Sequence, residues 1–290
     1  MTDVRIFEVG PRDGLQNEKG RIPTRDKIAL IDLLSAAGFP AIEATSFVSP
    51  KWVPQLADAD EVMNGIHREP GVSYAVLTPN MKGFERAVAA GASEVAVFAS
   101  ASEAFSLKNI NCTIAESIAR FAPLIEAASA ADLPVRGYVS CAVECPYSGP
   151  VDPGAAREVA VALHEMGCYE ISLADTIGRA TPEATRAMLQ SVIASVPPDR
   201  LAGHFHDTGG TALRNVAVAL ELGLRSFDSA VGGLGGCPYA PGAKGNLSTG
   251  ALLDVLDGMG VATGIDRDRL ALAEEHVAGL AAATREEAER

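Results

Sequence analysis

The stretch Val4-Arg5-Ile6-Phe7-Glu8-Val9-Gly10-Pro11-Arg12-Asp13-Gly14 opens the regular pattern of the chain. Its apolar first half predicts a buried β-strand over residues 4–9, which Gly10-Pro11 ends. Arg12 and Asp13 stand where the strand ends, and Gly14 lets the chain turn away. An adjacent cation and carboxylate stabilise a surface poorly, but together they can hold a metal ion and a substrate anion. We therefore expect a functional site at the end of this first strand.

Short apolar stretches alternate with amphipathic segments along the rest of the chain. Strands are predicted over residues 4–9, 41–46, 72–77, 94–99, 135–140, 169–174, 201–206 and 226–231. Helices are predicted over residues 24–37, 54–65, 80–90, 113–131, 153–166, 182–195 and 247–258, with one more ending at residue 222. This alternation predicts an α/β fold, a closed parallel (β/α)8 TIM barrel rather than an open sheet. No Pro/Gly/Ser-rich linker divides the chain, so we expect one domain over residues 1–290, with residues 266–290 as a C-terminal helical extension.

The composition excludes several functional classes. The formal net charge of −13 is opposite to the basic surface that nucleic-acid binding requires. No apolar run is long enough to span a membrane, and the N-terminus shows neither a secretory signal nor an Arg-rich presequence. The five cysteines are odd in number and widely spaced, which argues against a disulfide framework. We therefore expect a cytoplasmic protein with no nucleic-acid or membrane partner.

In such a barrel the chemistry takes place at the carboxyl ends of the strands. His204 and His206 end the predicted strand 201–206, and the two-residue period places both imidazoles on one face. If that face is the barrel interior, two nitrogens converge on one metal ion; the alternative is a pair of hydrogen-bonded core histidines. Asp13 and Asn246 would add two oxygen donors. This donor set leaves octahedral positions open, which predicts Mg or Mn, ions that also take substrate oxygens.

These candidate residues also have structural interpretations. Asp13 could serve only as a salt-bridge partner of Arg12, and Asn246 could cap the helix that follows it. Glu43 and Asp175 end or nearly end their strands, so each is a candidate for orienting a metal ligand or for acid–base catalysis. The alternative for both is a carboxylate that only neutralises Arg12.

Residues 232–246 contain six glycines, which predict a mobile loop that can approach a ligand closely. The spacing fits no nucleotide-binding motif. The loop carries one thiol, Cys237, which could be a small buried apolar residue. A thiol in a polar, mobile loop above a metal site is more typical of proton exchange or reaction, so Cys237 is a catalytic candidate.

Several motifs resemble those of the 3-hydroxy-3-methylglutaryl-CoA (HMG-CoA) lyases, a metallolyase family with a (β/α)8 barrel. The main ones are GPRDGLQNE at residues 10–18, HFHDT at residues 204–208 and GLGGCPY at residues 233–239. The resemblance runs over nearly the whole chain, and the last motif is the most specific. Isopropylmalate and homocitrate synthases share the Arg-Asp and His-x-His patterns but not this loop.

The resemblance implies cleavage of the CoA thioester HMG-CoA to acetoacetate and acetyl-CoA, with Mg or Mn as the divalent cofactor. It implies four metal ligands: Asp13, His204, His206 and Asn246. Arg12 would contact the substrate and its enolate, and Cys237 would be the active-site thiol. His204 or Asp175 would take the proton of the tertiary hydroxyl. A homodimer acting in leucine degradation and ketone body formation is expected.

Other functions remain open at this point. An isopropylmalate-synthase-like enzyme would instead condense an acyl-CoA with a 2-oxo acid. A barrel that binds CoA esters without catalysis would require a broken site, although all four ligand types and Cys237 are present. The substrate branch could also be longer than a methyl group. Residues 209–211 read Gly-Gly-Thr where animal members carry Tyr-Gly-Gln, so we expect differences in the fine shape of the pocket.

Overall fold

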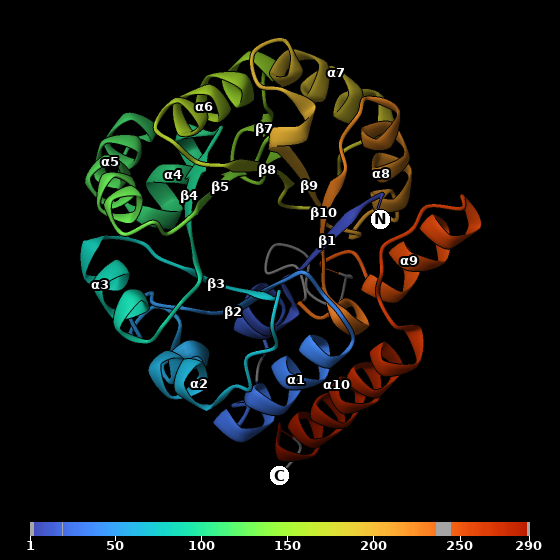
Figure 1. The fold of residues 1–290 in the computed structure, drawn as a ribbon. Helices are drawn as coiled ribbons and strands as arrows, with labels where there is room; N and C mark the ends of the chain where they lie inside the picture. The colour runs from blue at the N-terminus through green and yellow to red at the C-terminus, as the bar shows by residue number, and fades with distance from the viewer. Residues whose placement is uncertain (1–2, 19, 236–244, 289–290) are drawn as a thin grey trace.

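The strands form a closed barrel in the order β1-β10-β9-β8-β5-β4-β3-β2 (Figure 1). The computed structural model describes residues 3–18, 20–235 and 245–288, with side chains described as far as residue 280. All neighbouring barrel strands are parallel. They are β1 (Arg5–Glu8), β2 (Ala41–Ser46), β3 (Ser73–Leu77), β4 (Glu94–Ser100), β5 (Val135–Ser140), β8 (Glu170–Asp175), β9 (Leu201–Phe205) and β10 (Ser226–Ser229). The predicted TIM barrel is confirmed.

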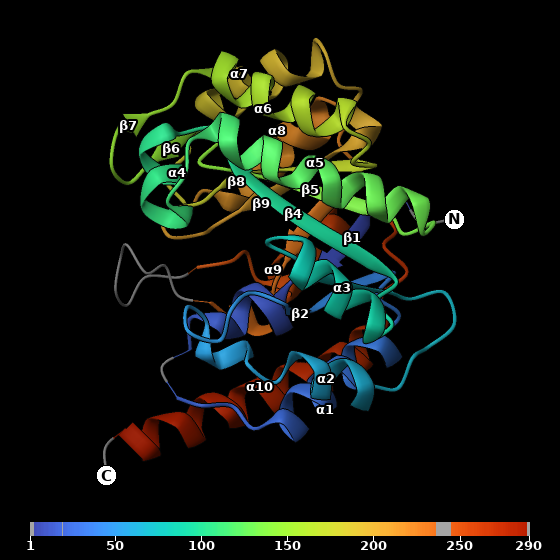
Figure 2. The same cartoon turned by 90° about the vertical axis from the view of Figure 1, so that its left-hand side faces the viewer.

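Helices form a ring around these strands, as the two perpendicular views show (Figures 1 and 2). They are α1 (Thr24–Ala36), α2 (Ala59–Gly65), α3 (Met81–Ala89), α4 (Glu103–Ile110), α5 (Ile114–Ala130), α6 (Pro153–Glu165), α7 (Pro182–Ile193), α8 (Ala212–Glu221), α9 (Thr249–Gly258) and α10 (Arg267–Ala288). The predicted additional C-terminal helix is α10, which lies beside α1. None of the described helices has the length and apolar character that crossing a membrane requires.

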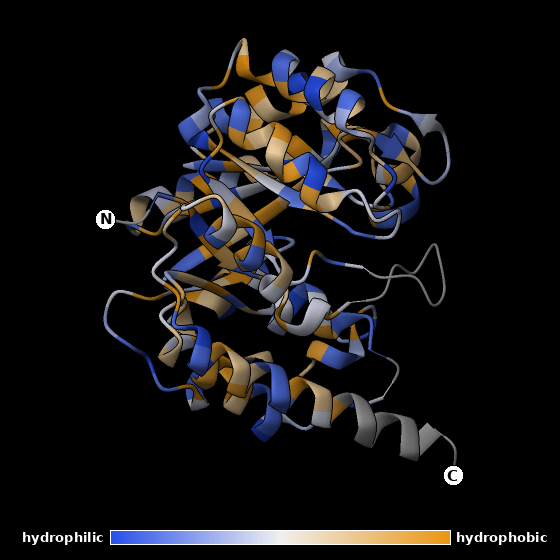
Figure 3. Ribbon diagram, turned by 90° about the vertical axis from the view of Figure 1, so that its right-hand side faces the viewer, coloured by the Kyte–Doolittle hydropathy of each residue, from blue (hydrophilic) through white to orange (hydrophobic). Residues whose placement is uncertain are grey.

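Burial follows the layers of the barrel. Every residue of β2, β8, β9 and β10 is buried, because one face of each strand fills the interior and the other contacts the helices. The helices carry both apolar and hydrophilic colours in Figure 3, as expected for elements with one buried and one exposed side.

Three local features differ from the sequence prediction. The helix predicted over residues 54–65 is divided into a 3₁₀ turn, Pro54–Leu56, and α2. The buried Lys27 ammonium donates to the Gln55 carbonyl, which a continuous helix would have used for its own hydrogen bond. The prediction also lacked α4 and the short hairpin of β6 (Glu144–Cys145) and β7 (Gly149–Pro150), both inserted where barrel strands end.

Glu8 connects the end of β1 to the segments that follow β10 through hydrogen bonds. Its buried Oε1 accepts hydrogen bonds from the backbone nitrogens of Gly10 (2.8 Å) and Val231 (2.9 Å), and Oε2 accepts one from Thr249 Oγ1 (2.6 Å). A Cβ at position 10 would lie 2.6 Å from Glu8 Oε1, so any larger residue there would displace this carboxylate. Burial raises the pKa of Glu8 to about 7, although the three hydrogen bonds lower it.

We expect Glu8→Gln to change how stability depends on pH. The folded protein binds the Glu8 proton more tightly than the unfolded chain, so the contribution of this carboxyl is greatest below its ordinary pKa of 4.5 and is lost as the pH rises to about 7. Over this pH range the free energy of unfolding should fall by an amount on the order of 3 kcal/mol. Urea unfolding of wild type and variant across this range measures it, with the exposed Glu61→Gln as control. A wild-type-minus-variant difference that is the same at every pH would contradict the prediction.

Candidate metal and substrate site

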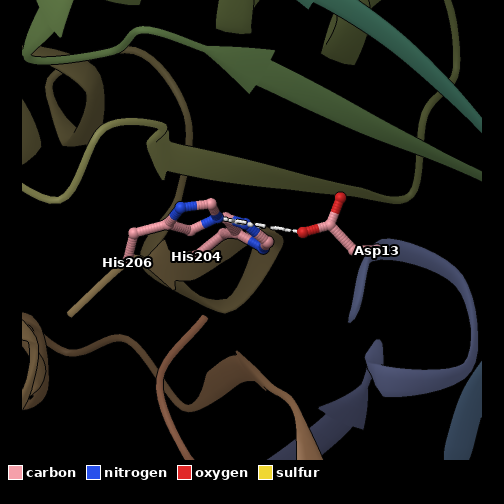
Figure 4. Close-up of side chains that lie close together, drawn as sticks. All are labelled: Asp13, His204 and His206. Carbon is pink, nitrogen blue, oxygen red and sulfur yellow. Dashed lines mark hydrogen bonds and ion pairs between the residues drawn. The ribbon is translucent and has the colours of Figure 1, made fainter. Parts of the chain in front are cut away.

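A tight π-helical turn, Gly10–Gly14, positions the first candidate residues. The backbone nitrogens of Arg12, Asp13 and Gly14 all donate to the Val9 carbonyl, at 3.1, 2.8 and 3.2 Å. The chain therefore folds over the end of β1 instead of continuing as a strand. This turn directs the Asp13 side chain towards His204 and His206 (Figure 4).

Asp13, His204 and His206 form one cluster whose donor atoms lie within 4.8 Å of one another. The two Nε2 atoms are 3.1 Å apart. Asp13 Oδ2 lies 3.9 Å from His204 Nε2 and 3.8 Å from His206 Nε2. Both imidazoles are buried, so this geometry supports the expectation that the two histidines face the same point in the barrel interior.

Asn246 joins this cluster. Its Nδ2 donates to Asp13 Oδ2 at 2.9 Å and to the Leu234 carbonyl at 3.2 Å, and its backbone pairs with His206 as an isolated bridge. The alternative role as a helix cap is wrong, because Ser248 occupies the N-cap position of α9. Gly235, with φ +97°, has room only for hydrogen, since a Cβ there would lie 2.8 Å from Asn246 Nδ2.

Arg12 and Glu43 lie beside the cluster as a buried ion pair. Arg12 Nε donates to Glu43 Oε2 at 2.6 Å, and Nη1 contacts Asp13 Oδ1 at 2.5 Å. Burial opposes the guanidinium charge, but Glu43 and Asp13 outweigh it and raise the pKa of Arg12. Burial also raises the pKa of Glu43, partly offset by Arg12. Tyr138 completes the group, since its hydroxyl donates to Glu43 Oε2 at 3.2 Å.

Asp175 differs from the other candidate residues because its carboxylate binds backbone nitrogens. Its Oδ1 accepts from the Arg179 nitrogen at 3.2 Å and its Oδ2 from the Ala180 nitrogen at 2.9 Å, so the carboxylate holds the loop after β8. Burial raises the pKa of Asp175, whereas these bonds and the nearby His206 lower it. Asp175 is not among the three residues of the donor cluster, and it does not pair with Arg12 in the described structure.

A layer of buried charges below the cluster was missed by the sequence reasoning. Arg136, on β5, is fully buried and ion-paired with Asp228 on β10 at 2.6 Å and with Glu170 on β8 at 2.7 Å. Asp228 Oδ2 lies 3.0 Å from His204 Nδ1. Charged residues inside otherwise apolar predicted strands were the available signal for this layer.

The donor set fits a divalent cation. Neighbouring ligands in an octahedral shell of metal–donor distances near 2.1 Å lie about 3.0 Å apart, close to the 3.1 Å between the two Nε2 atoms. His204 presents Nε2 to the cluster while Nδ1 faces a carboxylate, which is the arrangement typical of metal-bound histidines. One carboxylate, two imidazoles and an amide oxygen are all donor types that bind divalent metal ions.

Cys237 lies outside the described residues. The described residues that flank its segment lie at the cluster: the Asn246 nitrogen donates to the Gly235 carbonyl at 3.3 Å, and the Asp207 nitrogen to the Gly245 carbonyl at 2.7 Å. Gly235 and Gly245, the described residues on either side of Cys237, therefore lie beside the candidate metal ligands Asn246 and His206.

The chain is similar to several known proteins. The chain is 60% identical over 267 residues to the mouse protein named mitochondrial hydroxymethylglutaryl-CoA lyase, covering 92% of this chain and 82% of the mouse chain. The crystal structure of HMG-CoA lyase from Brucella melitensis is 61% identical, with a TM-score of 0.95 over 97% of this chain and 99% of that chain. An HMG-CoA lyase from Acinetobacter baumannii, solved with coenzyme A and 3-methylmalate, is 40% identical, with a TM-score of 0.91 over 96% and 91%. The HMGL-like family model matches residues 3–277, and the chain belongs to the HMGL-like family.

Proposed function

We propose that this protein is a divalent-metal-dependent carbon–carbon lyase that cleaves HMG-CoA to acetoacetate and acetyl-CoA. The observation that carries the proposal is the Asp13-His204-His206 cluster beside buried Arg12, in a chain at least 60% identical to two proteins named as HMG-CoA lyases. The coenzyme A bound in the A. baumannii structure supports a CoA thioester as substrate. These relatives favour cleavage over the condensing and non-catalytic alternatives.

Asp13, His204, His206 and Asn246 are the proposed metal ligands. The bound ion would polarise the tertiary hydroxyl and the free carboxylate of the substrate. For Asn246, turning the amide would present Oδ1 in place of the Nδ2 that now faces Asp13. Mg and Mn both suit these donors, and the choice between them is part of the proposal.

Arg12 is proposed to stabilise the thioester oxygen as it gains negative charge. Nε and Nη1 are occupied by Glu43 and Asp13, whereas Nη2 has no acceptor among the described residues. Glu43 therefore positions the guanidinium and leaves one nitrogen for substrate. His204 and Asp175 remain the proposed proton acceptors, and Cys237 is the proposed proton donor to the departing carbon.

We extend the proposal to the domain organisation and the cellular context. Residues 1–290 act as one barrel domain with the extension 266–290, because Arg269 donates to the Ala36 carbonyl and ties α10 to the end of α1. We keep the homodimer, the cytoplasmic location and the place in leucine degradation and ketone body formation as proposals. The mouse relatives include one protein named as mitochondrial and one named as cytoplasmic.

Removal of divalent ions tests the central claim. Chelation is expected to abolish cleavage of HMG-CoA, and Mg or Mn to restore it. Asp13→Asn keeps the shape of the side chain but loses its charge, so it should weaken Mn²⁺ binding measured by calorimetry. Asp152→Asn, at an exposed cap of α6, is the matched control. Full activity of exhaustively chelated enzyme would overturn the metal-dependent mechanism.

Arg12→Gln tests transition-state stabilisation. Turnover should fall by roughly 10²-fold or more, with a much smaller change in KM, because the guanidinium charge is used when the enolate forms. Steady-state kinetics measure both constants, and Arg86→Gln on the surface controls for the loss of an arginine. A raised KM with unchanged turnover would assign Arg12 to ground-state binding instead.

Cys237→Ser should retain Mn²⁺ and substrate-analogue binding but lose most turnover, because a hydroxyl is a much weaker acid than a thiol. Cys237 should also be alkylated readily in free enzyme and protected by the analogue. Cys168 provides the comparison, since burial raises the pKa of its thiol to about 12 and should slow alkylation. Near-normal turnover of Cys237→Ser, or alkylation of Cys237 without loss of activity, would reject this role.

A further inference from the structure

Asp228 contacts the candidate metal ligand His204 from below. The two residues are register partners on neighbouring strands β10 and β9, and Asp228 Oδ2 lies 3.0 Å from His204 Nδ1. Asp228 is itself not part of the donor cluster, and its side chain is fully buried. Its hydrogen-bond contact with the cluster is through the His204 imidazole.

Arg136 fixes the orientation of the Asp228 carboxylate and keeps it ionised as a hydrogen-bond acceptor. Its Nη2 donates to Oδ1 at 2.6 Å and its Nη1 to Oδ2 at 3.1 Å, and Ser172 Oγ also donates to Oδ2 at 2.9 Å. The guanidinium lies 4.1 Å from the Phe7 ring centroid and 5.0 Å from that of Tyr138, which restrains its position. Both carboxylate oxygens are thus held as acceptors.

A carboxylate held as an acceptor selects the tautomer of the histidine it contacts. A neutral His204 that donates from Nδ1 to Asp228 Oδ2 carries its lone pair on Nε2. That Nε2 is the atom that faces His206 and Asp13. The geometry points to Asp228 as a positioning residue, fixed by Arg136, that holds His204 in the tautomer able to bind a metal ion. This inference rests on the proposed metal-dependent function.

Asp228→Asn tests the inference because Arg136 also dictates the orientation of the new amide. The shortest contact of the guanidinium, at Oδ1, demands an oxygen, so the amide NH₂ takes the Oδ2 position and donates to His204 Nδ1. The imidazole proton is then displaced to Nε2, which can no longer bind a cation as it stands. We expect Mn²⁺ affinity, measured by calorimetry, to fall by roughly 10- to 100-fold.

Ser172→Ala is the matched control. It removes a neutral hydrogen bond from the same Oδ2 and leaves the carboxylate in place, so Mn²⁺ affinity should stay at the wild-type value. Asp228→Asn with wild-type affinity, or an equal loss in both variants, would overturn the assignment. A purely structural role would lower thermal stability without this difference in affinity.

Nitrogen-15 NMR of His204 in metal-free wild-type protein gives a test that does not require the variant to fold. We expect the Nδ1-protonated tautomer in wild type and, where it folds, the Nε2-protonated tautomer in Asp228→Asn. An Nε2-protonated His204 in wild type would overturn the inference. Failure of wild type to bind Mn²⁺ at all would instead refute the proposed metal, whichever tautomer is observed.

Discussion

Closure of the barrel between β1 and β10 is the constraint on which the site depends. Pairing of Phe7 with Asp228 and of Glu8 with Ser229 joins residues more than two hundred positions apart in the sequence. Glu8 then secures the junction through Val231 and Thr249. This closure places the turn that carries Asp13 opposite His204, on β9, and His206, which follows that strand. The site therefore depends on this long-range pairing and not on any local segment.

The buried charges below the cluster are costly to the fold. Removing one partner of a fully buried ion pair typically costs about 3–5 kcal/mol, whereas replacing the whole pair by apolar residues is often neutral. Stability alone therefore does not explain why Arg136 and Asp228 occupy the barrel interior. The contact of Asp228 with His204 offers an explanation, because an apolar core would leave the imidazole free to rotate and to change tautomer.

Much of this arrangement could be predicted from sequence, for identifiable reasons. The apolar period of the strands and the rule that parallel barrels place chemistry at strand ends were enough to select Asp13, Glu43, His204 and His206. The ion pair of Arg136 and Asp228 was not predicted, because both residues lie inside strands. Their strands, β5 and β10, are not neighbours in the sheet. Their contact runs across the interior, and no local pattern encodes which inward residues meet there. The division of the helix predicted over residues 54–65 was not predicted for a similar reason, because it depends on Lys27, which is distant in the sequence.

The charge of the site depends on how many carboxylates each buried guanidinium group neutralises. Arg12 is shared between Asp13 and Glu43, so these three ionised groups carry one excess negative charge. Arg136 is shared between Asp228 and Glu170, and Glu170 also pairs with Arg5, which balances the charge of that group. These charges lie in a buried environment, where screening by water is weak. A divalent cation at the cluster would relieve this repulsion and leave the site able to accept the carboxylate of the proposed substrate. Because the ion would bind the folded chain and not the unfolded one, the same binding would also stabilise the fold. The excess negative charge of Asp13, Glu43 and Arg12 thus favours binding of a cation before an anionic substrate.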